Sequence, residues 1–204
     1  MKINVDKKHW ICMVIALLMA AVLAGILEEK RIHDLQENVA QEVFRFHVLA
    51  NSDSEYDQAL KMKVKENVIA YMRRRMPKTV NAGQTREWVV THLSEIENVS
   101  RATLRAEKCK DSVIAEVSQS YFPNKTYGDV MFPKGNYEAL RIRIGKADGQ
   151  NWWCVLYPNL CFLDAVHAVV PEEGKKELKN VLEEEEYEMV TALSKFRVKW
   201  FFFQ

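Results

Sequence analysis

The sequence predicts an α+β fold, in which an N-terminal membrane segment precedes one domain with two long helices packed on a sheet. Three observations support this prediction. An uncharged run of residues extends from Trp10 to Leu27. Apolar residues recur every three or four positions in residues 55–75 and 85–106, which is typical of amphipathic helices. Several shorter stretches alternate apolar and polar side chains, which favours a mainly antiparallel sheet of four or five strands.

The apolar run near the N-terminus has the composition of a segment that enters a membrane. Its length of about 18 residues is near the lower limit for a helix that spans the hydrocarbon core, and it is slightly long for a signal peptide. Lys2, Lys7 and Lys8 precede the run, and charged residues close it at positions 28–31. Positive charge on the N-terminal side favours a cytoplasmic N-terminus, so we expect the rest of the chain outside the cytoplasm.

The composition of this segment is compatible with two fates. Residues 22–24, Val-Leu-Ala, resemble the small-residue pattern that signal peptidase cuts, and an uncleaved anchor fits equally. We therefore expect a signal peptide or signal anchor at residues 1–27, a stalk at 28–42 and a single exported α+β domain at 43–204. The chain is expected to contact a membrane through its N-terminal segment if that segment stays uncleaved.

The charge of the chain argues against nucleic acid as a partner. The formal net charge is +1, and the first 27 residues contribute +2 through three lysines and one aspartate, which leaves −1 for the remainder. Phosphate binding requires a basic face, whereas the arginines at 73–75 are better explained as the basic end of a helix. The acidic residues 183–186 are expected on a solvated helix face.

The exported domain is predicted to begin with a strand and two helices. Residues 43–50 alternate apolar with other side chains, as a half-buried strand does. Polar residues at 51–54 break this strand and can cap a helix over 55–75. The second helical pattern runs from about Thr85 to Ala106, and a strand from Val113 ends before Pro123.

The second half of the domain is predicted from turn formers and alternation. Proline and glycine at 133–136 and Asp148-Gly149 favour two turns. The predicted elements are a hairpin of residues 129–132 and 140–144, a strand over 151–157, a charged helix over 172–193 and a last strand over 196–202.

One short stretch, residues 151–162, holds two of the five tryptophans and two of the four cysteines. An oxidising compartment favours a disulfide between Cys154 and Cys161. Their spacing is not that of a CxxC redox motif, and no histidine lies near enough to complete a zinc site. Because the Cα atoms are too far apart on a straight strand or helix, a disulfide requires a chain reversal, which Pro158-Asn159 allows. Two separate buried thiols are the alternative, and Cys109 has no evident partner.

Residue types suited to hydrolysis occur at the end of the first predicted strand. His47 with Asp53 or Asp57 would supply acid–base chemistry, which makes a secreted hydrolase the alternative function. However, the sequence has no G-x-S-x-G motif and no glycine-rich phosphate loop, and Ser52 to Ser54 are better placed as a helix cap. We therefore expect no catalytic residues, no metal and no cofactor.

Three stretches together resemble a known protein family. They are FRFHVLANSDS at residues 44–54, YGDVMFP at 127–133 and NWWCVLYPNLCF at 151–162. In this order they are similar to stage II sporulation protein R of endospore-forming Firmicutes, and the resemblance covers about residues 43–165. The sequence after Cys161 resembles the family less closely.

The resemblance implies a signalling protein without catalytic activity of its own. Members of the family are made in the forespore and exported into the space between the forespore and mother-cell membranes. There they activate a membrane-embedded aspartic peptidase that processes pro-sigma-E. The resemblance therefore implies this peptidase as the partner, and a protein that is secreted into the intermembrane space or anchored to the membrane facing it.

The candidate partner-binding residues lie in loops and at the start of the tryptophan strand, where interface anchors are common. They are Asn51, Ser52, Asp53, Asp57, Asp129, Trp152 and Trp153. Because the two tryptophans are adjacent in a strand, we expect them on opposite faces of the sheet. Replacing Asn51, Asp53 or Asp129 by alanine is expected to reduce processing of the sigma factor and to leave folding unchanged.

Overall fold

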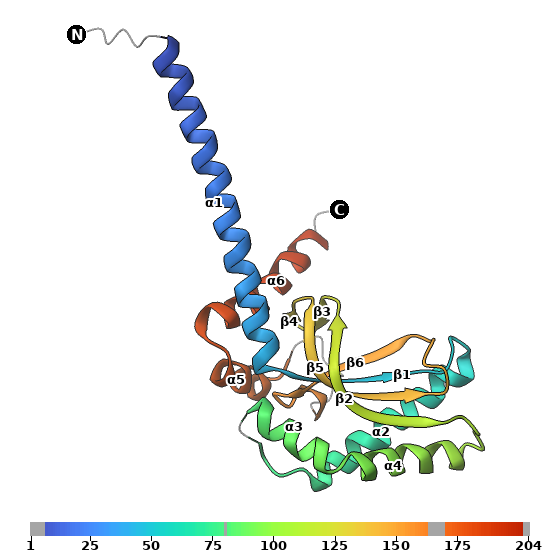
Figure 1. The fold of residues 1–204 in the computed structure, drawn as a ribbon. Helices are drawn as coiled ribbons and strands as arrows, with labels where there is room; N and C mark the ends of the chain where they lie inside the picture. Colours follow the sequence, from blue (N-terminus) through green and yellow to red (C-terminus); the bar gives the residue numbers. More distant parts are fainter. Residues whose placement is uncertain (1–6, 80, 163–169, 202–204) are drawn as a thin grey trace.

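The computed structural model describes residues 7–79, 81–162 and 170–201 (Figure 1). Its elements are α1 (Lys7–Glu42), β1 (Phe44–Leu49), α2 (Glu55–Arg75), α3 (Ala82–Thr91), α4 (Leu93–Ala106), β2 (Val113–Phe122), β3 (Lys125–Tyr127), β4 (Val130–Phe132), β5 (Gly135–Ile144), β6 (Asn151–Tyr157), η1 (Leu160–Phe162), α5 (Glu172–Val181) and α6 (Glu184–Phe201). This order of helices and strands confirms the predicted α+β class.

The larger sheet has four strands in the order β2-β5-β1-β6. β1 pairs with β5 in parallel, while the β2–β5 and β1–β6 pairs are antiparallel. β3 and β4 form a separate antiparallel pair, inserted in the chain between β2 and β5. The prediction of a mainly antiparallel sheet of four or five strands is therefore confirmed.

The first face of the larger sheet is covered by α2, α3 and α4, which lie below the sheet in Figure 1. Phe46 and Val48 of β1 project to this face beside Leu140 and Ile142 of β5, and all four side chains are fully buried. Burial of each such side chain contributes about 1.5–3 kcal/mol. This apolar layer is the main source of stability of the domain.

The second face is covered over part of its area by the C-terminal end of α1, which we call its foot, and by the β3–β4 pair, α5 and α6 (Figure 1). Their apolar side chains form a second buried cluster, which includes Val39, Phe122, Phe132, Tyr137, Leu178 and Val190. β1 is consequently buried on both faces. The prediction of a half-buried strand at residues 43–50 is wrong, because its alternate residues face a second packed layer and not solvent.

α1 is one helix that includes both the predicted membrane segment and the predicted stalk. Its apolar side chains are exposed along the first part, with Leu17 at 63% and Leu23 at 57% exposure. By length and composition the helix is able to span a membrane, with a mean hydropathy of 2.7 in its most apolar window. At the other end Val39 and the adjoining Val43 are buried in the second cluster, so the foot of α1 is part of the core.

The predicted helix over 85–106 is divided into α3 and α4 at His92. The His92 ring nitrogen Nδ1 lies 2.8 Å from the carbonyl oxygen of Trp88, and the two rings stack. The apolar spacing continues across this break, so periodicity alone predicted a single helix. In contrast, α2 has the predicted bounds and begins after Ser54, whose side-chain oxygen accepts the N–H of Asp57 at 3.2 Å.

Three further predictions are wrong. Residues 130–132 form β4 and pair with β3, whereas β5 pairs with β2, so the predicted hairpin of 129–132 with 140–144 does not form. At the C-terminus the charged region contains two helices, and α6 continues to Phe201 where a strand over 196–202 was predicted. Residue 202 lies outside the described residues.

Candidate partner-binding site

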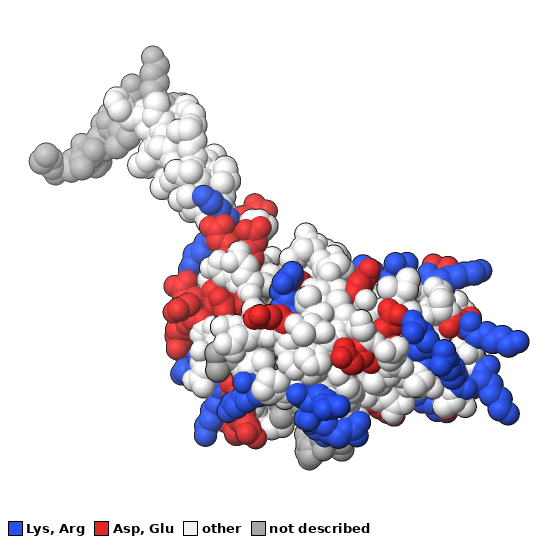
Figure 2. Space-filling model, turned by 60° about the horizontal axis from the view of Figure 1, so that its bottom comes forward, with Lys and Arg blue, Asp and Glu red and all other residues white. Residues whose placement is uncertain are grey.

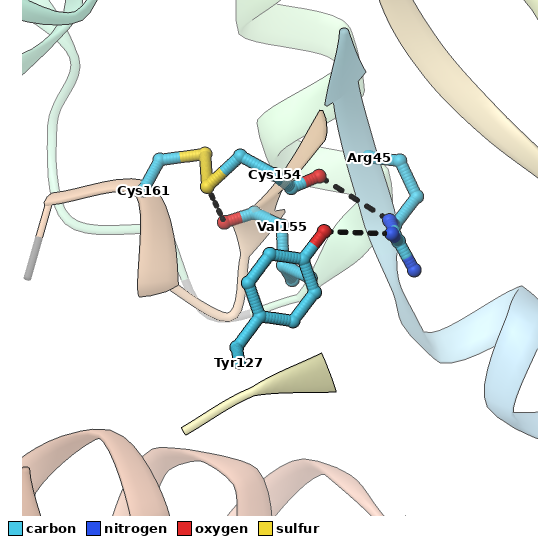
Figure 3. The surroundings of a disulfide bond; sticks show 5 residues. All are labelled: Arg45, Tyr127, Cys154, Val155 and Cys161. Carbon is cyan, nitrogen blue, oxygen red and sulfur yellow. Dashed lines mark hydrogen bonds between the residues drawn. A yellow bond between two sulfur atoms is a disulfide. The ribbon is translucent and has the colours of Figure 1, made fainter. Parts of the chain in front are cut away.

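Cys154 and Cys161 form a disulfide at the end of β6, with their Cα atoms 5.6 Å apart (Figure 3). The chain reverses between them through Pro158 and Asn159 into η1. Both cysteines are buried, at 5% and 9% exposure, within the cluster of the first face. The disulfide therefore fixes the end of β6 from within the core. Cys109 is a free thiol, and burial raises its pKa.

Arg45 of β1 is fully buried, and its side chain points toward Tyr127 and the carbonyl of Cys154 (Figure 3). Its Nε donates to the carbonyl oxygen of Cys154 at 3.2 Å, and its Nη2 donates to the hydroxyl of Tyr127 at 3.0 Å. The guanidinium carbon lies close to four aromatic ring centroids, at 4.4 Å from Phe122, 4.9 Å from Tyr137, 5.3 Å from Phe132 and 5.7 Å from Tyr127. We call these four rings the aromatic cage.

The aromatic cage stands in place of a counter-ion. Among the described residues no carboxylate pairs with Arg45, and its Nη1 has no hydrogen-bond partner. Desolvation lowers the pKa of Arg45, but a guanidinium stays protonated in proteins, so the charge is kept. Desolvation also raises the pKa of Tyr137 to about 12, which keeps its hydroxyl neutral. The cation is thus held by ring faces and two hydrogen bonds.

His47 lies two residues further along β1 on the same face and is 2% exposed. Its ring stacks on Trp153 with centroids 4.9 Å apart, and its Nε2 accepts a hydrogen bond from Arg141 Nε at 3.0 Å. Desolvation, together with the charges of Arg141 and Arg45, lowers the pKa of His47 to about 3. His47 is therefore neutral near pH 7.

Four of the candidate residues form a hydrogen-bonded clasp between residues 51–57, which are the loop after β1 and the first turn of α2, and the turn 145–150. Asp57 Oδ2 accepts from Ser52 Oγ at 2.6 Å and from Asn51 Nδ2 at 3.0 Å. Asn51 Oδ1 accepts the backbone N–H of Lys146 at 3.0 Å. Asp53 Oδ1 accepts that of Gln150 at 2.6 Å. These polar groups are directed at each other and at the turn, so they determine the shape of the loop.

Two glycines permit the close approach of loop and turn in this clasp. Gly145 has φ +57°, and a Cβ on it would collide with the side chain of Asn51. A Cβ on Gly149 would collide with the backbone of Ser52. The Asp57 carboxylate is 8% exposed, and the hydrogen bond from Ser52, with a smaller effect from Asn51, lowers its pKa. In the clasp the loop and the turn are thus in close contact, and the Asp57 carboxylate has hydrogen-bond donors.

Trp152 and Trp153 lie on opposite faces of β6, as expected, and both are half-buried. Trp152 packs edge-on against Phe46 with centroids 5.5 Å apart, and Lys65 Nζ lies 5.3 Å from its ring centroid. Trp153 packs against His47, and Lys125 Nζ lies 5.5 Å from its ring centroid. Each tryptophan therefore keeps an accessible portion beside a lysine, which is a combination suited to an interface.

Asp129 lies away from the other candidates, between the β3–β4 pair and α5. Its Oδ1 accepts the N–H of Val170 at 2.9 Å, and its Oδ2 pairs with Lys175 Nζ at 2.7 Å. Partial burial would raise the pKa of Asp129, but the bonds from Lys175 and Val170 outweigh it and lower this pKa. The structure thus gathers six of the seven candidates where β1 ends and β6 begins, and it separates Asp129 from them.

The side chains of the alternative hydrolase do not form a catalytic arrangement. His47 contacts Arg141, Trp153 and Phe122. Asp57 is bonded to Asn51 and Ser52, and Asp53 accepts the N–H of Gln150. A base with a pKa of about 3 has little affinity for a proton at neutral pH. Within the described ranges no group of three or more His, Cys, Asp or Glu residues is arranged to hold a metal ion.

Charged side chains are distributed unevenly over the surface. Figure 2 shows acidic side chains gathered beside the foot of α1 and basic side chains at the opposite end of the domain. The acidic group includes the exposed residues 183–185, of which Glu185 pairs with Arg31 of α1 at 3.2 Å. Glu186 is buried at 4% exposure and accepts the N–H of Glu183 at 2.9 Å, so the prediction of a solvated face is wrong for this residue.

Sequence reasoning missed Arg45, Arg141 and the aromatic cage. The available signal was the pair Arg45 and His47 at alternate positions of an otherwise apolar strand, which was interpreted as a solvent-facing side. The cage residues come from β2, β3, β4 and β5, and no local pattern connects them to β1.

Two comparisons with known proteins identify relatives of the chain. A family model described as "Stage II sporulation protein R" matches residues 40–167. A protein of Bacillus subtilis (strain 168), named "Stage II sporulation protein R", is 33% identical over 186 residues, which cover 89% of this chain and 83% of that protein. No solved structure matches the chain.

Proposed function

The chain belongs to the stage II sporulation protein R family, and we propose that it is an exported signal that activates the membrane-embedded aspartic peptidase processing pro-sigma-E. Family membership gives the chain a role in sporulation. In this proposal the protein is secreted from the forespore into the intermembrane space, or it stays anchored to the membrane facing that space. An N-terminal apolar helix and a disulfide are both compatible with this location.

The observation that carries the proposal is the continuity of α1 from an apolar helix into the folded core. Twelve residues separate Leu27 at the end of the apolar run from the buried Val39. At about 1.5 Å per helical residue, this distance is about 18 Å. An uncleaved chain would therefore hold its domain close to the membrane surface, within reach of the outward-facing parts of a membrane-embedded peptidase.

The proposed mechanism is binding without catalysis by this chain. A ligand that binds the active arrangement of the peptidase more tightly than the inactive one shifts the equilibrium between the two by its differential affinity. Such a ligand benefits from a rigid surface, because less conformational entropy is lost on binding. The clasp, the disulfide and the doubly covered β1 all favour rigidity at the candidate surface.

Co-expression in a bacterium that does not sporulate tests the proposal. The full chain, the peptidase and pro-sigma-E are produced together, and cleavage of pro-sigma-E is followed by immunoblot. We expect cleavage with the full chain and little cleavage without it. An inactive peptidase, with its catalytic aspartate replaced, should abolish cleavage. Cleavage that persists with the inactive peptidase would assign catalysis to this chain. Equal cleavage with and without this chain would contradict activation.

A further inference from the structure

The outer strand β2 exposes one edge of the larger sheet. Gly145 donates its N–H to the carbonyl oxygen of Ser112 at 2.8 Å, in the register that pairs Val113 with Ile144. Backbone groups alternate in direction along a strand. The even-numbered residues of β2 therefore bond to β5, and the odd-numbered residues direct their N–H and C=O groups to the free edge.

Only the first half of this edge is protected in the described part of the chain. The N–H of Ala115 donates to Glu97 Oε2 of α4 at 3.2 Å, and Glu97 is held by Arg101. No element described here bonds to the outward backbone groups of Val117, Gln119 and Tyr121, and the Tyr121 side chain is 60% exposed. Native proteins normally cover or charge such edges, because an open edge is a template for another strand.

A groove continues from this open edge to the foot of α1. It encloses about 570 Å³ and is lined by Gln119 of β2, the start of β5, the start of α3 and one side of α1. Its amide side chains are those of Gln36, Gln41, Gln119 and Asn136. An amide group offers both a donor and an acceptor, which matches the alternating groups of a peptide backbone.

Among the charged side chains that line the groove, one cation has no ion-pair partner in the described part of the chain. Glu138 pairs with Arg86, and Glu37 lies 3.3 Å from His33. The ammonium group of Lys134, an exposed residue, makes no ion pair with the described residues. An acidic side chain of an occupant would pair with this lysine.

From these observations we infer that residues 117–121 of β2 accept an extended segment of the peptidase as an added strand, with an acidic residue of that segment at Lys134. This inference rests on the proposed function, because it names the peptidase as the occupant. Main-chain hydrogen bonds at the edge supply affinity, and the groove beside α1 supplies specificity. The amide-lined groove then recognises the segment where it leaves the edge.

A matched pair of variants at one position tests this inference. Gln119→Pro removes an outward N–H that is not used by the β2–β5 ladder, and proline is tolerated at such edge positions. Gln119→Ala removes the side chain and keeps the N–H. The full chain and the detergent-solubilised peptidase are co-purified, and pro-sigma-E cleavage is measured in parallel. We expect binding by Gln119→Ala within a few-fold of the unaltered chain and binding by Gln119→Pro weaker by about tenfold or more.

The outcomes separate the inference from the proposed function. Unchanged binding by a folded Gln119→Pro chain would overturn strand addition. Failure of the unaltered chain to bind or activate the peptidase would overturn the proposed function and the occupant named here. A change from dimer to monomer in Gln119→Pro would show that the edge pairs with a second copy and overturn the peptidase as occupant.

A surface variant keeps the inference falsifiable if Gln119→Pro does not fold. Lys134→Glu changes an exposed side chain and is expected to weaken co-purification by about tenfold or more, because it repels an acidic segment. Lys108→Glu, a charge reversal at an exposed residue in the turn between α4 and β2, is the matched control and should bind like the unaltered chain. Equal binding by the two variants would overturn the acidic occupant.

Discussion

The two faces of the four-stranded sheet differ in the chemistry of their packing. On the first face, α2, α3 and α4 cover apolar side chains such as Phe46 and Ile142. On the second face, Arg45, His47 and Arg141 project from the same two strands among aromatic rings. Apolar burial needs no specific partner, whereas buried polar groups are tolerated only with the right partners. The first face therefore supplies stability, and the second face depends on the arrangement of its neighbours.

This difference bears on function because α1 joins the domain on the second face. Val39 and Val43 at the foot of α1 belong to the same cluster as Phe122 and Tyr137, which also surround Arg45. A displacement of α1 would act first on this cluster. The end of α1 is therefore packed on the second face and not on the first.

The largest effect is expected at Arg45. Arg45→Ala removes the cation from the aromatic cage and leaves a cavity, with the Tyr127 hydroxyl and the Cys154 carbonyl unbonded. We expect a loss of about 3–5 kcal/mol in the free energy of unfolding, from the cavity and the lost hydrogen bonds, measured by urea denaturation. Arg45→Met, with a similar volume and a sulfur that packs well on rings, should lose clearly less. An equal loss in both variants would show that the charge itself stabilises the second face.

The next largest effect is expected from the disulfide, which joins the core of the first face to the chain after β6. Closing a loop with a sequence separation of 7 corresponds to about 2–3 kcal/mol in the chain-entropy description. Replacing Cys154 and Cys161 together by serine should lower the free energy of unfolding by this amount, and replacing the free Cys109 by serine is the control. A loss confined to the Cys109 variant would contradict this assignment.

A smaller effect, which depends on pH, is expected from His47. Its pKa is about 3 in the folded chain and 6.5 in the unfolded chain, so between these pH values the unfolded state binds the proton and the folded state does not. Stability should therefore be constant above pH 6.5 and should fall with decreasing pH below it, by at most about 1.4 kcal/mol per pH unit. Denaturation curves between pH 7.5 and 5 measure this slope.

His47→Phe, which keeps the aromatic stack and does not titrate, should flatten the slope between pH 6.5 and 5. Asp57 and Asp129 have pKa values lowered below 3.8, so their bonds are lost only at more acidic pH. A slope that is the same in His47→Phe and in the unaltered chain would show that another group carries the pH dependence.

The smallest effect is expected in the clasp. Asn51→Ala removes the acceptor of the Lys146 N–H and one donor to Asp57. Because Asn51 is half-buried, we expect a loss of about 1–2 kcal/mol in the free energy of unfolding. Lys146→Ala is the control, since Lys146 contributes its backbone N–H and should stay within about 0.5 kcal/mol. Full stability in Asn51→Ala, together with reduced peptidase activation, would favour the direct partner contact that the sequence predicted.

The sequence predicted those elements whose signals are local. α2 has a serine cap at Ser54 and a run of arginines at its end, so both of its bounds were visible. The pairing of β2 with β5 was not predicted, because Phe122 meets Gly135 across an inserted pair of strands, and the turn formers at 133–136 suggested a shorter hairpin. Registers between distant strands leave no local pattern.

The sequence named candidate partner-binding residues, but it did not predict the environment of their side chains. Asn51, Ser52 and Asp57 were selected as polar loop residues that contact a partner, but in the structure they bond to each other and to the backbone of the turn 145–150. Arg45 was overlooked because a charged residue in an alternating strand normally faces solvent. Only the three-dimensional arrangement reveals the cage that makes its burial possible.

One measurement tests the central claim most directly, that the domain acts by contact from outside the cytoplasm. The full chain and a form without residues 1–27 are each co-expressed with the peptidase and pro-sigma-E, at matched levels of folded protein. The account predicts cleavage of pro-sigma-E with the full chain and none with the form that stays in the cytoplasm. Equal cleavage with both forms would contradict it.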